Sequence, residues 1–480
     1  MNMPLDRSHD AATTDLRSIL WHIPNFEAAR PSVEERRQAG KRLRKSVPRS
    51  AHAHYRPEKD RVDPIDILQA QDKTRVSKLI PIKYGRMLAS PFGFLRGSAA
   101  IMARDLASTP TTRLEVIACG DMHVANFGVF GSAEQKLIFA INDFDEVYPA
   151  PWEYDLKRLV ASAAVVARFM GGDRADAEAS ARAAVEAYRE HMHRYSCMGY
   201  LEVWHDEIDE GRIKRALAFR NDPRPALKRA RRKGNISALQ KLTRREGNEH
   251  RFVERPPLIV REKILSDGTP TMAGFSAMLR DYMRSLEEGR KGLLSRYRLV
   301  DAVRKVVGVG SVGTSCWALL LQGRDCEDPL FLQVKEAGPS VLSCLSKVRL
   351  PFKNQGQRVV VGQRIIQGSP DIFLGWGGNA RGDFYVRQLV DMKGGAQFLE
   401  NRPDLLDELN AYCALCGWAL ALAHAKSGDP AAIAGYCGNS EALDEALGKF
   451  ALAYMRQTDR DFEALRKARA SGRIEAAAIS

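Results

Sequence analysis

The segment 120–145, GDMHVANFGVFGSAEQKLIFAINDFD, holds acids and an amide in an order that suits phosphoryl transfer. Asn126 follows Asp121 in the D-x-x-x-x-N pattern of a phosphotransferase catalytic loop. Asp121 is the candidate base that accepts the proton of an attacking hydroxyl. Asn126 and Asp143 offer a neutral and an anionic oxygen to Mg²⁺, and Asp145 is a candidate for a second ion or for the substrate. The apolar run 137–141 predicts a strand that returns Asp143 to the mouth of this loop.

A glycine-rich segment, VVGVGSVGT (306–314), occurs much later in the chain. A dinucleotide-binding turn would require a helix that opens at the third glycine, but residues 314–321 look like the second strand of a hairpin. The glycines alone also fit an ordinary tight hairpin. As a phosphate-covering loop, the segment would use its backbone N–H groups. The candidate nucleotide contacts in it are Gly308, Gly310, Ser311 and Gly313.

The strand-like run 330–335, LFLQVK, ends in Lys335, the residue type that neutralises nucleotide phosphates at the end of a strand. A strand, a glycine loop, a second strand and a strand-borne lysine make up the kinase arrangement. In ordinary kinases these parts precede the catalytic loop, whereas here Lys335 follows Asp121. We therefore predict an α+β, kinase-like two-lobed fold that is circularly permuted, with a large helical lobe and a small antiparallel-sheet lobe.

The expected organisation has four parts. Residues 1–60 are a basic, partly flexible arm that ends in extended structure. Residues 61–298 form the large helical lobe, with residues 201–257 helical and 258–298 as a connection. Residues 299–395 form the small sheet lobe, with 389–395 as the hinge that meets adenine, and residues 396–480 add helices that complete the large lobe.

Several segments carry a resemblance to a known family: SPFGFLRG (90–97), CGDMHVANFG (119–128), INDFDEVYPAPWEYDLKRL (141–159), VGVGSVGT (307–314), LQVKEA (332–337), FYVRQLVDMKGG (384–395) and LAHAKSGD (422–429). The chain resembles bacterial domain of unknown function 2252 from about residue 35 to about residue 465. Its region 120–159 is also similar to aminoglycoside-type and choline-type phosphotransferases. That similarity implies that Asp155 supports the catalytic loop and that His123 is the histidine of a G-D-x-H-x-x-N form. Arg96 is a candidate for contact with a phosphate or a substrate anion, or for an ion pair that holds its own loop.

The sequence departs from the phosphotransferase pattern in two places. Cys119 stands where small-molecule kinases usually have a histidine. A kinase lysine is normally oriented by a helix glutamate, but no acidic residue lies between Glu336 and Asp371, and the predicted helix 354–367 offers none. Two hypotheses follow: an ATP- and Mg²⁺-dependent phosphotransferase acting on a hydroxyl-bearing, small-molecule acceptor, or a nucleotide-binding regulatory protein with little catalysis.

Charge suggests a third hypothesis. The chain of 480 residues has a formal net charge of +14, and much of the excess lies in 36–49 and 212–255. Clustered Lys and Arg bind nucleic-acid phosphates, although neither cluster is interleaved with aromatic residues. A solvated helix face, or a basic rim that draws ATP toward a cleft, explains the same charge. Because we find neither a signal-peptide core nor a membrane-length apolar run, we expect a cytoplasmic protein without membrane partners.

Two other groups of residues were weighed. Cys413 and Cys416 lie in an apolar helical run with no second pair to complete a zinc site, so we predict buried thiols. His424, Ser427 and Asp429 could supply a hydrolase triad, but the alternative is a packed histidine in a helix that stops at Gly428 through a left-handed turn.

Overall fold

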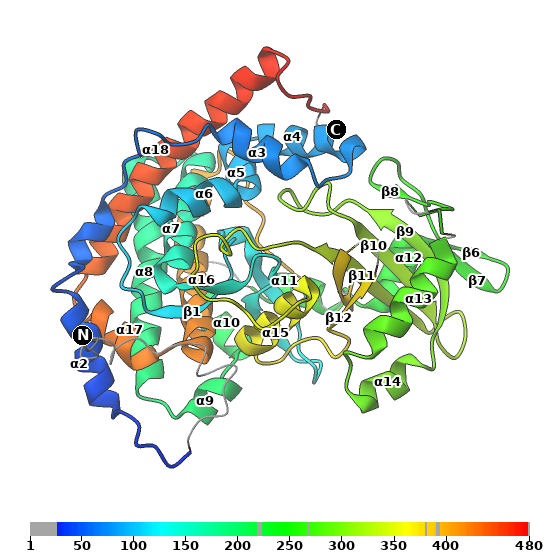
Figure 1. Cartoon of the computed structure of the whole chain (residues 1–480), viewed down its shortest axis with the longest axis horizontal. Coiled ribbons are helices and arrows are strands. Elements are labelled where there is room, and N and C mark those ends of the chain that lie inside the picture. The colour runs from blue at the N-terminus through cyan, green and yellow to red at the C-terminus, as the bar shows by residue number, and fades with distance from the viewer. Residues whose placement is uncertain are drawn as a thin grey trace, which may run out of the picture.

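The computed structural model describes residues 26–217, 223–265, 268–269, 271–379, 382–389 and 394–478. It is a mixed α+β protein in which long helices gather on one side and the largest sheet lies on the other (Figure 1). The expected hinge falls largely on 390–393, which lie outside the described residues.

The long helices come from both ends of the described chain and pack together. They are α7 (Trp152–Phe169), α8 (Arg174–Ser196), α16 (Leu406–Ser427), α17 (Pro430–Cys437) and α18 (Ala442–Ala470). Gly417 of α16 explains one close approach, because a Cβ there would lie 2.0 Å from the backbone oxygen of Ala184 in α8. Small residues thus let these two helices lie nearly backbone to backbone.

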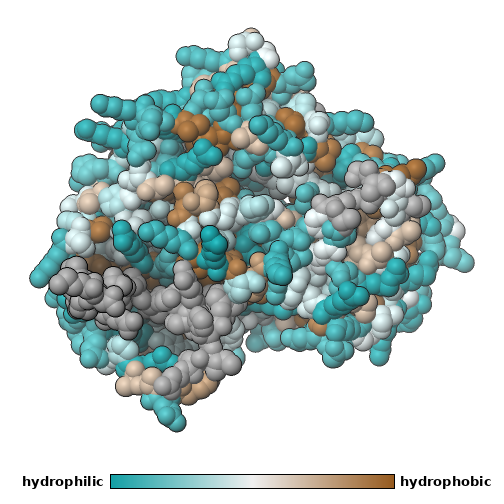
Figure 2. Space-filling model, viewed as in Figure 1, coloured by the Kyte–Doolittle hydropathy of each residue, from teal (hydrophilic) through white to brown (hydrophobic). Residues whose placement is uncertain are grey.

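One segment, Pro403–Ser427, is long and apolar enough by composition to cross a membrane. It comprises the 3₁₀ turn η4 (Pro403–Leu405) and α16, and α16 packs along α8 in the main core. Cys413 and Cys416 are fully buried in it, which confirms the predicted buried thiols. The face of the molecule drawn in Figure 2 is largely hydrophilic with scattered apolar patches, as expected when such a helix serves the core.

Shorter helices from the N-terminal part of the chain pack against these long helices at different places. They are α2 (Val33–Leu43), η1 (Arg49–Ala53), α3 (Pro64–Asp72), η2 (Ser77–Leu79), α4 (Ile80–Leu88), α5 (Pro91–Gly97) and α6 (Ala99–Ala107). The expected flexible arm differs here, because α2 is an ordered helix whose Gly40 would place a Cβ 1.8 Å from the backbone oxygen of Ala432 in α17. Residues 1–25 of that arm lie outside the described residues.

Two small antiparallel sheets frame the 120–145 segment. β1 (Glu115–Ala118) pairs with β4 (Tyr148–Pro151), and β2 (Phe127–Gly131) pairs with β3 (Leu137–Ile141), which also pairs with β5 (Ile208–Asp209). The strand predicted over 137–141 is therefore confirmed. Because Phe127 lies opposite Ile141, the ends of the two strands bring Asn126 beside Asn142, whose N–H donates to the Asn126 backbone oxygen at 2.8 Å.

The largest sheet has six strands in the order β12-β13-β11-β10-β9-β8, all paired antiparallel. They are β8 (Ile259–Val260), β9 (Arg298–Lys305), β10 (Cys316–Gln322), β11 (Pro329–Ala337), β12 (Gly375–Asn379) and β13 (Gly382–Gln388). The glycine segment joins β9 to β10, so the predicted hairpin is confirmed and the dinucleotide-binding turn is wrong. The predicted helix 354–367 is α15 (Gln355–Gln367), which packs against β12 and β13.

The boundary drawn between helical lobe and sheet lobe needs correction. After α9 (Tyr200–His205), α10 (Glu210–Leu217) and α11 (Arg224–Arg231), the chain joins the sheet through α12 (Asn235–Leu242) and the hairpin β6 (Thr243–Glu246) and β7 (Glu249–Phe252). α13 (Thr271–Met283) and α14 (Glu288–Leu294) follow. Apolar contacts hold this region to the sheet: Leu239 and Phe252 share a cluster with Phe331, and Phe275 packs edge-on to Trp317. Residues from about 235 to 298 therefore belong with the sheet.

Candidate active site

A cleft of about 270 Å³ lies where the helical part meets the large sheet. Its lining comes from regions far apart in the sequence: residues within 119–126 and 143–146, the glycine loop, helices α3 and α5, and the chain just after β11. Two other cavities among the described residues measure about 20 and 10 Å³, which leaves room for little more than one water. Among the sequence-predicted site residues, those that line the cleft are Arg96, Asp121, His123, Asn126, Asp143, Asp145, Gly308, Gly310 and Ser311.

One carboxylate oxygen of Asp121 is bonded to Arg158, and the other is not. Its Oδ1 accepts bonds from Nε and Nη2 of Arg158 at 2.7 and 2.5 Å. Arg158 is 1% exposed and also donates to the backbone oxygen of Leu95. The Oδ2 atom lies 3.9 Å from His123 Nε2 and about as far from the position of a Cβ on Gly310. A rigid, half-engaged carboxylate of this kind can receive a proton on its free oxygen.

Asp155 supports the loop that carries Asp121. From the buried helix α7, its two oxygens accept the backbone N–H groups of Cys119 at 2.6 Å and Gly120 at 2.8 Å. His424 in α16 lies 3.4 Å from the same carboxylate and bonds Tyr188 through its other ring nitrogen. The role that the phosphotransferase resemblance implies for Asp155 therefore fits its contacts. Cys119 is a buried free thiol that also borders the cleft.

The hydrolase hypothesis for the 424–429 segment does not fit. Ser427 accepts the N–H of Ile117 and donates to the backbone of its own helix, while Asp429 caps the first turn of α17. His424 bonds neither of them. The helix does end at Gly428, but with φ of −130° rather than in a left-handed turn. Glycine is required there for space, since a Cβ would lie 2.7 Å from a methyl group of Val116.

Asn126, Asp143 and Asp145 present oxygens to the cleft. The Asn126 amide nitrogen donates to the Asp121 backbone oxygen at 2.7 Å, which leaves its side-chain oxygen as the group available to a cation. Asp143 Oδ1 is buried and has no hydrogen-bond partner within the described chain. The side chains of Asp143 and Asp145 are 36% and 30% exposed, so both are reachable from the cleft. Carboxylate and amide oxygens are the donors that Mg²⁺ prefers.

Lys335 reaches this acidic group from β11. Its ammonium is almost fully buried and lies 2.6 Å from Asp145 Oδ2 and 3.7 Å from Asp143 Oδ1. Asp145 also accepts a bond from the Tyr385 hydroxyl. The carboxylate that pairs with Lys335 thus comes from the D-F-D segment and not from a helix. Helix α15 contributes Arg358 instead, which donates to the backbone oxygens of Val147, Asp145 and Gly338.

The pKa values of the two aspartates beside Lys335 shift in opposite directions. Desolvation, followed by repulsion from Asp145, raises the pKa of Asp143. Desolvation also opposes ionisation of Asp145, but the ammonium of Lys335 and the hydroxyl of Tyr385 outweigh it and lower the pKa of Asp145. Burial alone would lower the pKa of Lys335, whereas attraction to the two carboxylates raises it well above its usual range. The resting site therefore has a firm Lys335–Asp145 ion pair and a second carboxyl without a strong partner.

The glycine loop is shaped by its glycines and anchored by the helical part. Gly308 and Gly313 have φ of 65° and 95°, which other residues rarely adopt, and a Cβ on Gly310 would lie 3.0 Å from the Arg96 backbone oxygen. Arg75 donates to the Val312 oxygen. Ser311, in contrast, donates its hydroxyl to the Val307 backbone oxygen at 3.0 Å and so stabilises the loop itself. Gly313 packs over the Arg75 side chain rather than lining the cleft.

Arg96 and His123 complete the predicted set. Arg96, on α5, lines the cleft, and the structure gives it no hydrogen bond or ion pair among the described residues; its guanidinium lies 6.0 Å from the Phe92 ring centre. The alternative prediction, in which Arg96 forms an ion pair that holds its own loop, therefore does not fit the described residues. His123 is buried, and desolvation followed by the nearby Arg158 and Arg96 lowers its pKa well below the usual value, so it stays neutral beside Asp121.

Sequence reasoning missed Arg158, Arg358, Tyr385 and Glu146. Arg158 stands in the quoted YDLKRL motif, three residues after Asp155, and that proximity was its one available signal. Glu146 lines the cleft and accepts the Val341 N–H at 2.7 Å through Oε2. Desolvation raises its pKa to about 7. The other two come from β13 and α15, and no local pattern links them to the D-F-D segment.

Three arginines of the 36–49 cluster contact the protein itself, whereas Lys41, Arg42 and Lys45 are exposed. Arg44 and Arg49 donate to the backbone oxygens of Tyr436 and Cys437 at the end of α17, and Arg36 pairs with Asp429. In the second basic segment, Arg212 pairs with Asp206 and Arg231 pairs with Glu210. These arginines donate to backbone oxygens or pair with carboxylates of the protein itself.

The fold and the cleft define an α+β protein in which a buried lysine and a glycine hairpin face a set of aspartates. Residues 75–468 match the sequence profile of a family described as an uncharacterized protein conserved in bacteria, domain of unknown function 2252. The chain belongs to this family. Comparisons with curated proteins and with solved structures give no match.

The raised pKa of Glu146 predicts a pH-dependent cost to stability. Because the folded state favours the protonated acid, stability falls as pH rises from the usual carboxyl range through about 7. Glu146→Gln should keep the bond to the Val341 N–H and remove this penalty. The variant should gain up to about 3 kcal/mol over wild type at about pH 8 and much less at about pH 5. Urea unfolding at both pH values measures the gain; the same gain at each pH would contradict it.

Proposed function

We propose that this protein is an ATP- and Mg²⁺-dependent phosphotransferase that acts on a hydroxyl-bearing small-molecule acceptor. The observation that carries the proposal is the position of Lys335, encoded late in the chain, against Asp143 and Asp145, encoded early. The glycine loop lines the same cleft as Asp121. Base, metal ligands, phosphate-binding lysine and loop are the parts that phosphoryl transfer needs within reach of one another.

The fold supports the proposal in two ways. The glycine hairpin β9–β10 is followed by the lysine strand β11 and then by helix α15, in the order of a kinase-like small lobe. The helical part combines α7 and α8 with α16 and α18, so the sheet interrupts it in the sequence. This is the arrangement expected of a circularly permuted chain, in which the large lobe starts and finishes the polypeptide.

The residues present fit a divalent cation. Within the described chain, Asp143 Oδ1 is a buried oxygen that no hydrogen-bond donor reaches, and Asn126 and Asp145 also line the cleft. Mg²⁺, when bound, would neutralise charge on the nucleotide phosphates. These three residues would hold it.

The remaining residues have separate tasks. Asp121 would receive the acceptor proton on Oδ2, with Arg158 fixing its orientation. Lys335 would orient the phosphates, and the backbone of the glycine loop would cover them. Arg96 would bind an anionic oxygen, because its cation lines the cleft and forms no hydrogen bond or ion pair with the residues that the structure describes.

The alternative of a nucleotide-binding protein with little catalysis draws support from one contact. Arg158 occupies one oxygen of Asp121 with two hydrogen bonds and so competes with a substrate hydroxyl for that carboxylate. Against it, Lys335 does have an orienting carboxylate in Asp145. The nucleic-acid hypothesis draws less support from the 36–49 cluster, because Arg44 and Arg49 bond backbone oxygens of the protein itself.

Turnover and binding should separate in two variants. In a metabolite screen for ATP consumption, Asp121→Asn should lower kcat by about 10²- to 10⁴-fold while Mg-ATP still raises the unfolding temperature. Asp143→Ala should lose that metal-dependent shift, because it removes a cation ligand. Asp60→Asn, on the exposed loop before α3, is the matched control and should behave as wild type.

The outcomes distinguish the hypotheses. A thermal shift without turnover on any acceptor would favour the nucleotide-binding regulatory protein. If Mg-ATP does not shift the unfolding temperature of the wild type, both the phosphotransferase hypothesis and the nucleotide-binding hypothesis are contradicted.

Arg96 provides a second, independent test. Arg96→Ala should lower kcat/KM for ATP by about 10²- to 10³-fold, because a preorganised charge on the phosphates is lost. Arg104→Ala, an exposed arginine on the neighbouring helix α6, should leave it unchanged. Steady-state kinetics measure both. Equal effects in the two variants would show that Arg96 contacts no phosphate.

A further inference from the structure

A second cluster of chemically active side chains lies on the sheet, outside the cleft. His250 on β7 meets Cys326 and Glu327, which lie in the turn between β10 and β11. The ligand atoms of these three residues all lie within 4.8 Å of one another. Glu327 Oε1 is 3.8 Å from His250 Nε2 and 3.9 Å from Cys326 Sγ. Ligand atoms around a tetrahedral zinc ion are about 3.5 Å apart, so little movement is needed to bring all three onto one ion.

A hydrogen bond between His250 Nδ1 and Thr243 fixes the orientation of the imidazole ring. Thr243 donates its hydroxyl proton to the Leu239 backbone oxygen at 2.5 Å. Its oxygen can therefore only accept from His250 Nδ1, which lies 3.1 Å away. A neutral imidazole with its proton on Nδ1 has a lone pair on Nε2. That Nε2 atom is buried and has no hydrogen-bond partner in the part of the chain that the structure describes.

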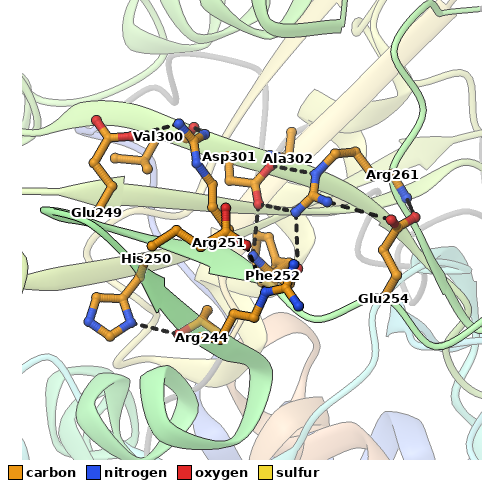
Figure 3. Close-up of polar contacts among 12 residues, drawn as sticks. Arg244, Glu249, His250, Arg251, Phe252, Glu254, Arg261, Val300, Asp301 and Ala302 are labelled. Carbon is orange, nitrogen blue, oxygen red and sulfur yellow. Dashed lines mark hydrogen bonds and ion pairs between the residues drawn. The ribbon is translucent and has the colours of Figure 1, made fainter.

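The strand that carries His250 is fixed to the sheet. Figure 3 shows the Asp301 carboxylate between the Phe252 backbone and the Arg261 guanidinium. Asp301 is 3% exposed, accepts the Phe252 N–H at 2.8 Å and pairs with Arg261 at 2.7 Å. Arg261 also donates to the Phe252 oxygen. The buried carboxylate of Asp301, on β9, therefore holds β7 in place beside β9.

We propose that His250 Nε2, Cys326 Sγ and Glu327 form a binding site for a divalent transition-metal ion of the zinc class. A neutral imidazole, a thiolate and a carboxylate are the ligands that zinc takes in proteins, and the hydrogen bond from His250 to Thr243 supplies the outer contact that orients such a ligand. Binding releases the thiol proton of Cys326. Three protein ligands leave the fourth position to water, and the ion ties the β6–β7 hairpin to the β10–β11 turn.

The site is independent of the proposed phosphotransferase reaction. Its donor set includes sulfur and nitrogen, whereas the cleft offers oxygen donors that suit Mg²⁺. None of its three residues lines the cleft. Failure of either proposal therefore leaves the other intact.

The test uses Co²⁺ as an optical probe on the full-length protein. Asp143→Ala serves as the background, so that the cleft does not contribute a second cation. Addition of Co²⁺ should produce a thiolate-to-metal absorption band that saturates at one equivalent. Cys326→Ser should abolish the band, whereas Cys344→Ser, an exposed cysteine elsewhere, should keep it. Zn²⁺ should displace Co²⁺ and remove the band.

Two further variants test the geometry. His250→Ala should weaken Co²⁺ binding by at least about 10-fold, and Thr243→Val should weaken it by about 10- to 100-fold through lost orientation. Zn²⁺ should raise the unfolding temperature of the background protein but not of Cys326→Ser, which also reports binding if a variant folds less well. The proposal is overturned if Co²⁺ gives no thiolate band, or if the band persists unchanged in Cys326→Ser or His250→Ala.

Discussion

The ion pair between Lys335 and Asp145 is the contact on which the cleft depends. It joins the large sheet to a loop of the helical part, over a sequence separation of 190 residues, and it is nearly excluded from water on the lysine side. Removing one partner of such a pair would leave a buried, uncompensated charge, which typically costs 3–5 kcal/mol. The pair therefore fixes how the glycine loop sits over the aspartates, and it sets which of the two carboxyls stays free of a strong partner.

The other side of the cleft rests on the helical core. Asp155 holds the backbone of the 119–120 turn, while Arg158, one helical turn later on α7, holds the Asp121 side chain. Both are fully buried charged groups on one helix, and His424 lies against Asp155 from α16. The proposed catalytic loop is thus held by hydrogen bonds from these buried groups, which limits how far Asp121 can move. Preorganisation of this kind is what a proton acceptor requires.

Local patterns were sufficient for the elements that carry the site. The strand at 137–141, the glycine hairpin, the lysine strand and the helix at 354–367 all follow from short-range apolar patterning and turn residues. The β6–β7 hairpin was missed because basic residues dominate 212–255, although Gly247 and Asn248 between two short runs form a recognisable turn signal.

Partners set by tertiary packing were not predictable. Tyr385 and Arg358 meet Asp145 only because β13 and α15 pack beside β11, and no spacing in the sequence encodes that contact. The acidic partner of Lys335 could not be identified from the sequence for the same reason. An acid was sought on the neighbouring helix, whereas the acid that pairs with it comes from the opposite side of the cleft.

The central claim is that the lysine and the aspartates act on one bound Mg-ATP, and a double-mutant cycle tests it most directly. Calorimetry would compare Mg-ATP binding by wild type, Lys335→Met, Asp143→Asn and the double variant, each checked for native circular dichroism. The account predicts weaker binding in both single variants and a coupling above about 0.5 kcal/mol, because the two side chains serve the same phosphates. Strictly additive losses, or binding unaffected by either change, would contradict it.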